Sequence, residues 1–191
     1  MENRNELFKA IPIFDSGLKD EEIRLFSVGH KEGQGLVDYL YGYAEAEEGN
    51  NLMRTYIVRD VKTDEFVGYF SLKAGMISIN ESKVNNVDTF DTMPGIELAN
   101  FAINSNYIAE HNSMKECGKI IFNELIIPII KEVSTKVGVR LIYIFALPLE
   151  SLIERYKEYR FKRLTSEQEE QLHKRLKPQY DEGCIFMFQE L

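Results

Sequence analysis

One apolar run constrains the fold of this chain more than any other segment. Residues 141–147 are LIYIFAL, apolar at both odd and even positions. Such a run is typical of a parallel strand that helices cover on both faces of its sheet. A strand-like segment (96–104) and then a helical segment (117–138) precede it. The order predicts a βαβ unit with 141–147 as a central strand.

The rest of the chain alternates between helical and strand patterns. Pro128 lies inside the helical pattern and lacks a backbone donor, so we expect a kink or a break there. The polar, turn-rich segment 80–95 is expected to be a surface loop. The other predicted elements are helices at 20–29, 35–50, 151–159 and 166–178, and strands at 53–61, 65–79, 161–164 and 184–191.

Composition indicates one soluble globular domain. No repeat, low-complexity tract or linker divides the 191 residues, of which 44% are hydrophobic and 28% charged. We therefore expect a single domain over 1–191 with one mixed α/β sheet. The start, MENRNELFKAIPIF, lacks the features of a signal peptide, and the longest apolar runs are far shorter than the roughly 20 residues that span a bilayer. The expectation is a cytoplasmic protein without membrane contact.

Charge and residue spacing exclude several classes of function. The net charge of −8 argues against a chain whose main partner is nucleic acid or anionic membrane. Because the three histidines are widely separated and the two cysteines form no C-x-x-C, no metal site is expected. No G-x-S-x-G motif is present, and Cys117 is interpreted as a packed thiol rather than a nucleophile.

The connection inside the βαβ unit carries a candidate phosphate site. The amides at the start of a helix favour an anion beyond the end of the preceding strand. Gly118 would let a pyrophosphate approach the backbone, and Lys115 or Lys119 would add positive charge. From this connection alone, a phosphate site and a glycine that merely starts a helix are equally supported.

The order of four segments resembles a known family. GIELANFAIN, KECGKI, LIYIFALP and LIERYKEYRF are similar to the acetyl-CoA-binding core of the GNAT superfamily of N-acetyltransferases, over about residues 55–164. The resemblance implies a mixed, mostly antiparallel sheet with a central splayed parallel strand pair and flanking helices. It also implies acetyl-CoA as the cosubstrate.

The resemblance assigns residues to that cosubstrate. The family's phosphate loop is usually Arg or Gln, two residues, Gly, one residue, then Gly or Ala. Lys115 stands at the Arg or Gln position and Gly118 at the first Gly position. Ile120 stands where the family has a second Gly or an Ala. The end of the first strand would pair its backbone with the pantetheine arm. The implied cosubstrate residues are Phe101, Ala102, Ile103, Lys115, Cys117, Gly118, Lys119 and Ile120.

Tyr156 takes the place of the family's general acid. The family often closes its core with an aromatic-Glu-Lys-x-Gly-Phe phrase, and RYKEYRF puts Tyr156 at that tyrosine and Arg160 at the glycine. A phenol stays protonated at neutral pH, ready to stabilise a leaving thiolate. From the residues alone, Tyr156 shares a helical face with Leu152, Ile153 and Tyr159, which is typical of a core position.

A left-handed helix cap at Arg160 would cost about 1 kcal/mol relative to glycine. Glu97 lies inside the apolar IELANFAI, and its position resembles the glutamate base of some family members. A solvated or paired side chain is the alternative for Glu97. Asn100 is a candidate for binding substrate.

The resemblance implies acetyl transfer to a primary amine, on a small molecule or a macromolecule, with Tyr156 as acid and Glu97 as base. The early part of the chain is similar in layout to GNAT-type toxins that acetylate aminoacyl-tRNA. The net charge argues against tRNA, although a basic cluster leaves it open: Arg155, Lys157, Arg160, Lys162 and Arg163.

The alternative function is a GNAT-fold module that binds acyl-CoA or a partner without turnover. The departures at Ile120 and Arg160 suggest it. The terminal strand at 184–191 is a candidate for pairing across a homodimer.

Overall fold

The computed structural model describes residues 3–84, 87–111, 114, 116–175 and 183–191. The chain forms two compact units. The first unit comprises Met1–Lys73 and Leu98–Ile129, and the second comprises Ala74–Glu97 and Ile130–Leu191. Strands β4 (Phe66–Val84) and β5 (Val87–Ile103) run through both units. The single domain expected from the sequence stays a prediction.

The first unit is built on an antiparallel sheet. Its strands are β1 (Asn3–Arg4), β2 (Phe8–Pro12), β3 (Arg54–Asp60) and the first part of β4. The β3–β4 hairpin confirms the one predicted at 53–79, whereas β1 and β2 were not predicted. The elements between β2 and β3 are the 3₁₀ helices η1 (Ile13–Asp15) and η2 (Lys31–Gly33) and the helices α1 (Asp20–Leu25), α2 (Gln34–Gly42) and α3 (Ala44–Gly49).

The single helix predicted at 35–50 is wrong, because the chain leaves the helical conformation at Tyr43. The backbone of Tyr43 has φ −129° and ψ −31°, and α3 starts directly after it. The preceding Gly42 has low helix propensity, which the periodic apolar pattern conceals. The core of this unit consists of Ile13, Phe26, Leu40, Ala44, Ile57, Phe66, Tyr69 and Ala102.

The helical segment before residue 138 has three parts. It runs through α5 (Cys117–Ile121), the π-helical turn η4 (Phe122–Ile126) and α6 (Ile127–Ser134). Pro128 has no amide to donate to the carbonyl four residues earlier, and the π turn lies at that carbonyl. The disturbance expected at Pro128 is confirmed as a change of helix type. A short helix α4 (Ser105–Glu110), which was not predicted, precedes this segment.

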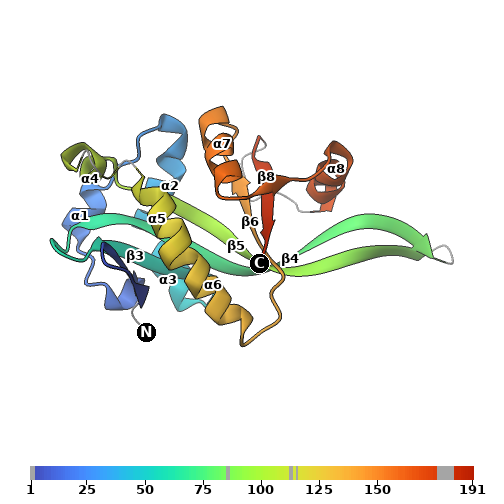
Figure 1. Ribbon diagram of the computed structural model, residues 1–191, viewed down its shortest axis with the longest axis horizontal. Helices are drawn as coiled ribbons and strands as arrows, with labels where there is room; N and C mark the ends of the chain where they lie inside the picture. The colour runs from blue at the N-terminus through green and yellow to red at the C-terminus, as the bar shows by residue number, and fades with distance from the viewer. Residues whose placement is uncertain (1–2, 85–86, 112–113, 115, 176–182) are drawn as a thin grey trace. The chain divides into compact units, whose positions relative to one another are not determined.

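In the second unit, β4 and β5 extend as a two-stranded ribbon (Figure 1). The loop predicted at 80–95 is therefore wrong. A two-stranded ribbon forms its backbone hydrogen bonds between its own strands and needs no apolar face, so the polar composition of this segment concealed it. The other elements of this unit are β6 (Leu141–Ala146), α7 (Glu150–Glu158), β7 (Lys162–Arg163), α8 (Ser166–Arg175) and β8 (Ile185–Glu190).

The strand order confirms the predicted fold class. Over the described residues the strands hydrogen-bond in the order β1-β2-β3-β4-β5-β6-β8-β7. The β5–β6 pair is parallel, and the pairs flanking it in each unit are antiparallel. The sheet is thus mixed and mostly antiparallel, with a central parallel pair and flanking helices. Within the described ranges, no helix combines the length and the apolar character needed to cross a membrane.

The terminal strand β8 lies between two strands rather than at an edge. It pairs with β6 over all six of its residues and with β7 at Met187 and Phe188. Strand β7 covers only two of the six residues of β8, so pairing of this strand across a homodimer stays a prediction. The neighbouring edge strand β7 has only two residues, the exposed Lys162 and Arg163. Short, charged edge strands discourage pairing with another chain.

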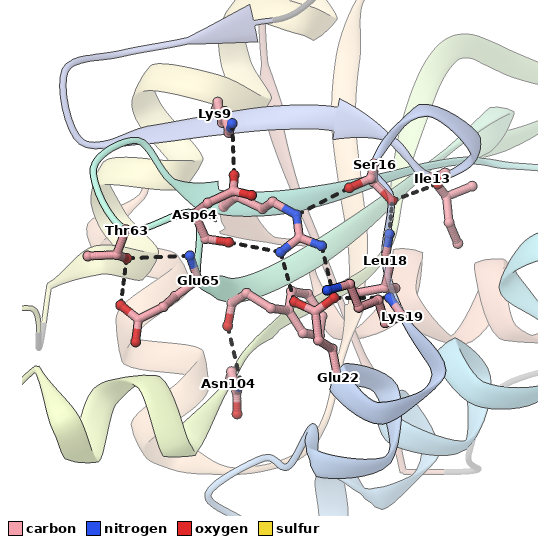
Figure 2. A network of polar contacts seen from close by, with 12 residues as sticks. Lys9, Ile13, Ser16, Leu18, Lys19, Glu22, Thr63, Asp64, Glu65 and Asn104 are labelled. Atoms are coloured by element: carbon pink, nitrogen blue, oxygen red, sulfur yellow. Dashed lines mark hydrogen bonds and ion pairs between the residues drawn. The ribbon is translucent and has the colours of Figure 1, made fainter.

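A buried arginine, Arg59, ties the first unit together, and the residues that accept its hydrogen bonds are labelled in Figure 2. The guanidinium of Arg59, which is 5% exposed, donates to both carboxylate oxygens of Glu22 on α1. It also donates to the carbonyl oxygens of Ser16 and Asp64. The planar fork of arginine suits such a set of acceptors, which a lysine would not satisfy. Hydrogen bonds from Arg59 lower the pKa of the Glu22 carboxyl.

Replacing Arg59 by Met should reduce the free energy of unfolding by about 2–3 kcal/mol, because it leaves a carboxylate and two carbonyl groups without their donor. The pKa of Glu22 lies below its ordinary value of 4.5 in the folded state, so the ion pair stabilises the fold fully above pH 4.5. The stabilisation is lost as the pH falls through the lowered pKa of the folded state. Urea unfolding at pH 7 and at pH 3 measures both effects.

Lys9→Met is the matched control, since Lys9 pairs with Asp64, whose side chain is 67% exposed. That change should cost less than about 1 kcal/mol. Equal losses in the two variants would show that the Arg59 network does not hold the unit together.

Candidate functional site

The parallel pair β5–β6 is short. Gly95, Ile96 and Glu97 pair with Leu141, Ile142 and Tyr143, and the register ends there. A Cβ atom at Gly95 would lie 2.6 Å from the Leu141 side chain and 3.1 Å from the Leu141 carbonyl oxygen, so any other residue here would force Leu141 to shift. Strand β5 continues to Ile103 although its pairing with β6 ends at Glu97.

Glu97 is buried at the end of this pairing and has a tyrosine as its partner. Its side chain is 4% exposed, and the Tyr143 hydroxyl donates to Glu97 Oε2 over 3.3 Å. The burial excludes a solvated side chain for Glu97. A paired side chain remains as the alternative, and the role as base stays a prediction. The sequence did not indicate Tyr143, because the two residues lie 46 positions apart and only the parallel register places them opposite each other.

A glycine on β4 makes room for that tyrosine. A Cβ atom at Gly75 would lie 1.9 Å from the Tyr143 hydroxyl oxygen and 2.9 Å from the ring carbon that carries it. A side chain at position 75 would therefore displace the Tyr143 ring from its present place. The ring of Tyr143 also stacks on Phe186, with centroids 5.6 Å apart. The hydrogen bond to Glu97 therefore comes from a phenol held on two sides.

Tyr156 is fixed by the way its helix ends. Arg160 has φ 70°, the left-handed conformation expected for it. The Arg160 amide donates to the Lys157 carbonyl, and the Phe161 amide donates to the Tyr156 carbonyl over 3.0 Å. These two bonds make a Schellman motif, in which a hydrophobic contact closes the turn. Here that contact is between the rings of Tyr156 and Phe161, at 5.5 Å.

Tyr156 faces inward from α7, as its helical spacing indicated. It is 5% exposed, and Ile153 and Tyr159 beside it are equally buried. Burial raises the pKa of the Tyr156 phenol well above its ordinary value, so the hydroxyl keeps its proton at neutral pH. A phenol that keeps its proton is a hydrogen-bond donor for a ligand.

The end of β5 is anchored to β4. The Asn104 amide donates to the Val67 carbonyl over 2.8 Å, and its side chain donates to the Phe66 carbonyl. The same side chain accepts from the Asn106 amide and so caps α4. Of the residues assigned to the cosubstrate, Ala102 is buried in the core and its neighbours Phe101 and Ile103 are half-buried.

Some of the backbone amides at the start of α5 already donate hydrogen bonds within the chain. The amides of Lys119 and Ile120 both donate to the Glu116 carbonyl, over 2.9 and 3.2 Å. Two of the predicted phosphate donors are therefore already used. Cys117 is 1% exposed, which agrees with a packed thiol, and Gly118 is half-buried. Lys115 lies outside the described residues.

Asn100 belongs to a different group of side chains. It is half-buried on β5, and its amide nitrogen lies 4.0 Å from the sulfur of Met53. The Tyr39 hydroxyl of α2 donates to the same sulfur over 3.3 Å. The fold thus places the predicted substrate residue beside a tyrosine that sequence spacing did not connect with it.

The fold also gathers polar groups next to α4. His111 Nε2 lies 3.0 Å from Glu65 Oε2, and the Tyr107 hydroxyl donates to Asp60 Oδ2 over 2.7 Å. Ligand-type atoms of Glu65, Glu110 and His111 lie within 4.8 Å of one another. Spacing along the sequence gave no hint of this cluster. Its contacts tie α4 to the β3–β4 turn, which is a structural role.

Replacing Arg160 by Gly should raise the free energy of unfolding by about 1 kcal/mol, because glycine adopts the left-handed conformation without the steric cost of a Cβ atom. Chemical denaturation monitored by circular dichroism measures the change. Arg160→Ala removes the same charged group but keeps the Cβ atom, so it should give no such gain. A gain of equal size in both variants would trace the effect to charge instead of conformation.

No protein-family model matches the sequence, and neither does any curated protein. The fold, in contrast, matches solved structures. A bacterial toxin matches with a TM-score of 0.69 at 11% identity, over 97% of this chain and 92% of that chain. A Tyr-to-Phe mutant of the toxin KacT matches with a TM-score of 0.67 at 16% identity, over 97% and 95%.

The AtaTR complex bound with acetyl-CoA matches with a TM-score of 0.62 at 16% identity, over 97% of this chain and 94% of that chain. AtaT complexed with acetyl-methionyl-tRNAfMet matches with a TM-score of 0.60, also at 16% identity, over 96% and 94%. At these identities the likeness concerns the fold. The chain has the fold of these toxins, which is the GNAT fold that its sequence resemblance implied.

Proposed function

We propose that the protein is an N-acetyltransferase that moves an acetyl group from acetyl-CoA to a primary amine. The observation that carries this proposal is the parallel β5–β6 pair, whose register ends at Glu97 and Tyr143 while β5 continues to Ile103. A strand edge of this kind offers backbone groups to an extended ligand such as the pantetheine arm. AtaT, which has the same fold at low identity, occurs in a complex bound with acetyl-CoA.

The reaction is a direct transfer in which atoms balance without a covalent enzyme intermediate. The amine nitrogen attacks the carbonyl carbon of the thioester, the new C–N bond forms and the C–S bond breaks. The amine loses one proton, and the departing thiolate gains hydrogen bonding or a proton. Glu97 is the proposed acceptor of the amine proton, either directly or through water. Its hydrogen bond with Tyr143 would fix the direction of the carboxylate.

Tyr156 is the proposed donor to the thiolate. Its pKa is raised by burial, whereas a thiol has an ordinary pKa of about 8.5. Full transfer of the phenolic proton to a thiolate would therefore be uphill. The phenol serves the reaction mainly as a neutral hydrogen-bond donor that stabilises the charge developing on sulfur.

The proposed cosubstrate contacts rest on backbone groups. Phe101, Ala102 and Ile103 would pair with the pantetheine arm, and the start of α5 would approach the phosphates. Because the amides of Lys119 and Ile120 already donate to Glu116, Gly118 and the cationic side chains would carry more of the phosphate binding. We therefore expect this protein to bind the phosphates more weakly than family members with a full loop do. The same weakness is the reason to keep the alternative function, a binding module without turnover.

We propose further that the acceptor is an aminoacyl-tRNA, as it is for GNAT-type toxins. AtaT has been solved in complex with acetyl-methionyl-tRNAfMet. All five basic residues of the predicted cluster are exposed. Lys157 pairs with Glu154, and Arg163 pairs with Glu169. Arg155, Arg160 and Lys162 have no carboxylate partner within the described ranges and so remain available for phosphates.

Tyr156→Phe should leave the affinity for acetyl-CoA unchanged and reduce the rate of acetyl transfer roughly 10- to 1,000-fold, because only the donor to the thiolate is lost. Thermal melting with and without acetyl-CoA measures binding, and the release of free thiol in the presence of an amine panel measures transfer. Tyr41→Phe makes the same change at a tyrosine that is 67% exposed, and it should behave as the unchanged protein.

Three results decide between the functions. Stabilisation by acetyl-CoA with thiol release supports the enzyme, and stabilisation without release with any amine supports the binding module. An absence of both would overturn the proposed cosubstrate. Equal rates for Tyr156→Phe and the unchanged protein would return Tyr156 to a purely structural role in the core.

The tRNA proposal makes a separate prediction about salt. If Arg155 and Lys162 contact phosphates, the double variant Arg155→Gln with Lys162→Gln should flatten the dependence of log K on log salt by roughly 1.5. Filter binding of aminoacyl-tRNA between low and high salt measures the slope. Lys31→Gln with Lys62→Gln removes the same charge from exposed positions in the first unit, and it should leave the slope intact. An equal slope in both double variants would exclude the basic cluster as the tRNA contact.

A further inference from the structure

Gly68 of β4 lies directly against the backbone of β5. A Cβ atom at Gly68 would lie 2.3 Å from the Ala102 carbonyl oxygen and 3.1 Å from the Ile103 Cα atom. Both are backbone atoms, which cannot turn aside as the end of a side chain can. A larger residue at position 68 would therefore push one of the two strands away from the other.

Strand β4 is held in place from its other side. Gly68 pairs with Val58 of β3, and its neighbours along β4, Val67 and Tyr69, are fully buried. Strand β3 is fixed in turn by the buried Arg59, which donates to a carboxylate on α1 and to two carbonyl oxygens. Because β4 has packed neighbours on this side, it has little room to move away from β5.

The end of β5, in contrast, is held along one edge. Its register with β6 ends at Glu97, whereas the strand continues to Ile103. Beyond Glu97, the described part of the chain gives that edge of β5 no strand partner. Contact between Gly68 and Ala102 is therefore relieved by a displacement of β5. A shift of about 1 Å would be needed to turn the 2.3 Å approach into an ordinary contact.

The same segment presents backbone groups on its open edge. Successive residues of a strand direct their N–H and C=O groups to opposite edges. The Asn104 amide donates to the Val67 carbonyl of β4, so the groups of Ile103 face the opposite edge. By the same alternation Ala102 faces β4, which agrees with its carbonyl beside Gly68, and Phe101 faces the open edge. Phe101 and Ile103 are half-buried, so a ligand can reach them.

We propose that Gly68 is a positioning residue for the cosubstrate. By leaving room for the Ala102 carbonyl, it sets the path of the end of β5 and so places the backbone groups of Phe101 and Ile103 for the pantetheine arm. This inference rests on the proposed function and adds a residue that governs cosubstrate affinity without touching the cosubstrate. Since a hydrogen bond is lost when its heavy atoms are more than about 3.5 Å apart, a shift of about 1 Å is enough to weaken this pairing.

The test uses two probes: acetyl-CoA, and adenosine 3′,5′-bisphosphate, which lacks the pantetheine arm. Isothermal titration calorimetry well below the melting temperature measures both affinities. Gly68→Ala should weaken the binding of acetyl-CoA roughly tenfold or more and change the affinity for the nucleotide less than about twofold, because only the arm pairs with the end of β5. Gly138→Ala is the matched control: a Cβ atom there has nothing within 4 Å, so both affinities should stay unchanged.

A second variant loosens the same contact without adding an atom. The Asn104 side chain donates to the Phe66 carbonyl of β4 and caps α4. Asn104→Ser keeps a capping hydroxyl but is too short to reach Phe66, so it should show the same selective loss of acetyl-CoA affinity. It decides the question if Gly68→Ala does not fold.

Kinetics separate positioning from a general loss of structure. Gly68→Ala should raise KM for acetyl-CoA roughly tenfold and change kcat less than about threefold, because Tyr156 and Glu97 are untouched. Unchanged affinity for acetyl-CoA in Gly68→Ala and Asn104→Ser, or an equal loss for both probes, would overturn the positioning role. A failure of the unchanged protein to bind acetyl-CoA would instead overturn the proposed function. If acetyl-CoA binds and no amine releases thiol, the calorimetry decides on the role of Gly68 by itself.

Discussion

The parallel pairing of β5 with β6 is the constraint on which the rest of the candidate site depends. It covers only three residue pairs, and two glycines lie in close contact with it. Gly95 leaves room for Leu141, and Gly75 leaves room for the Tyr143 hydroxyl. With both in place, the register sets Glu97 opposite Tyr143. The buried carboxylate therefore obtains its donor from the pairing itself, not from a mobile side chain.

A second constraint fixes Tyr156 through the backbone. Its carbonyl accepts the closing bond of the Schellman motif, and its ring makes the contact that seals the motif. The same residue thus holds the end of α7 and presents the hydroxyl proposed for the reaction. That dual use explains why an arginine is tolerated in a left-handed conformation at position 160: the bonds and the ring contact around it outweigh a cost of about 1 kcal/mol.

The sequence sufficed for features that are local or periodic. The run at 141–147 predicted a central parallel strand because burial on both faces leaves its mark on every residue. The Arg160 cap and the inward position of Tyr156 followed from spacing within one helix. The ribbon strands at 80–84 and 87–95 were missed because they need no apolar face, and the break at Tyr43 was missed because the apolar period continues across it.

The candidate site was harder to predict because its partners meet only through register and tertiary packing. Tyr143 reaches Glu97 across 46 residues, and the contact between Tyr39 and Met53 joins a helix to the start of a strand. Nothing in the spacing of the glutamates on α3 separates Glu47 from its neighbours. Only the packing of α3 buries its Oε2 atom.

Glu48, Glu97 and Glu47 show why burial alone does not identify a functional carboxylate. Glu48 receives a backbone amide and an arginine, so its charge is satisfied within the fold. Glu97 accepts a hydrogen bond from the Tyr143 phenol, which orients the carboxylate without adding a charge of its own. Glu47 lies beside the phenol of Tyr39, whose pKa its negative charge raises. The role of a buried carboxylate therefore follows from the groups that contact it, not from its depth of burial alone.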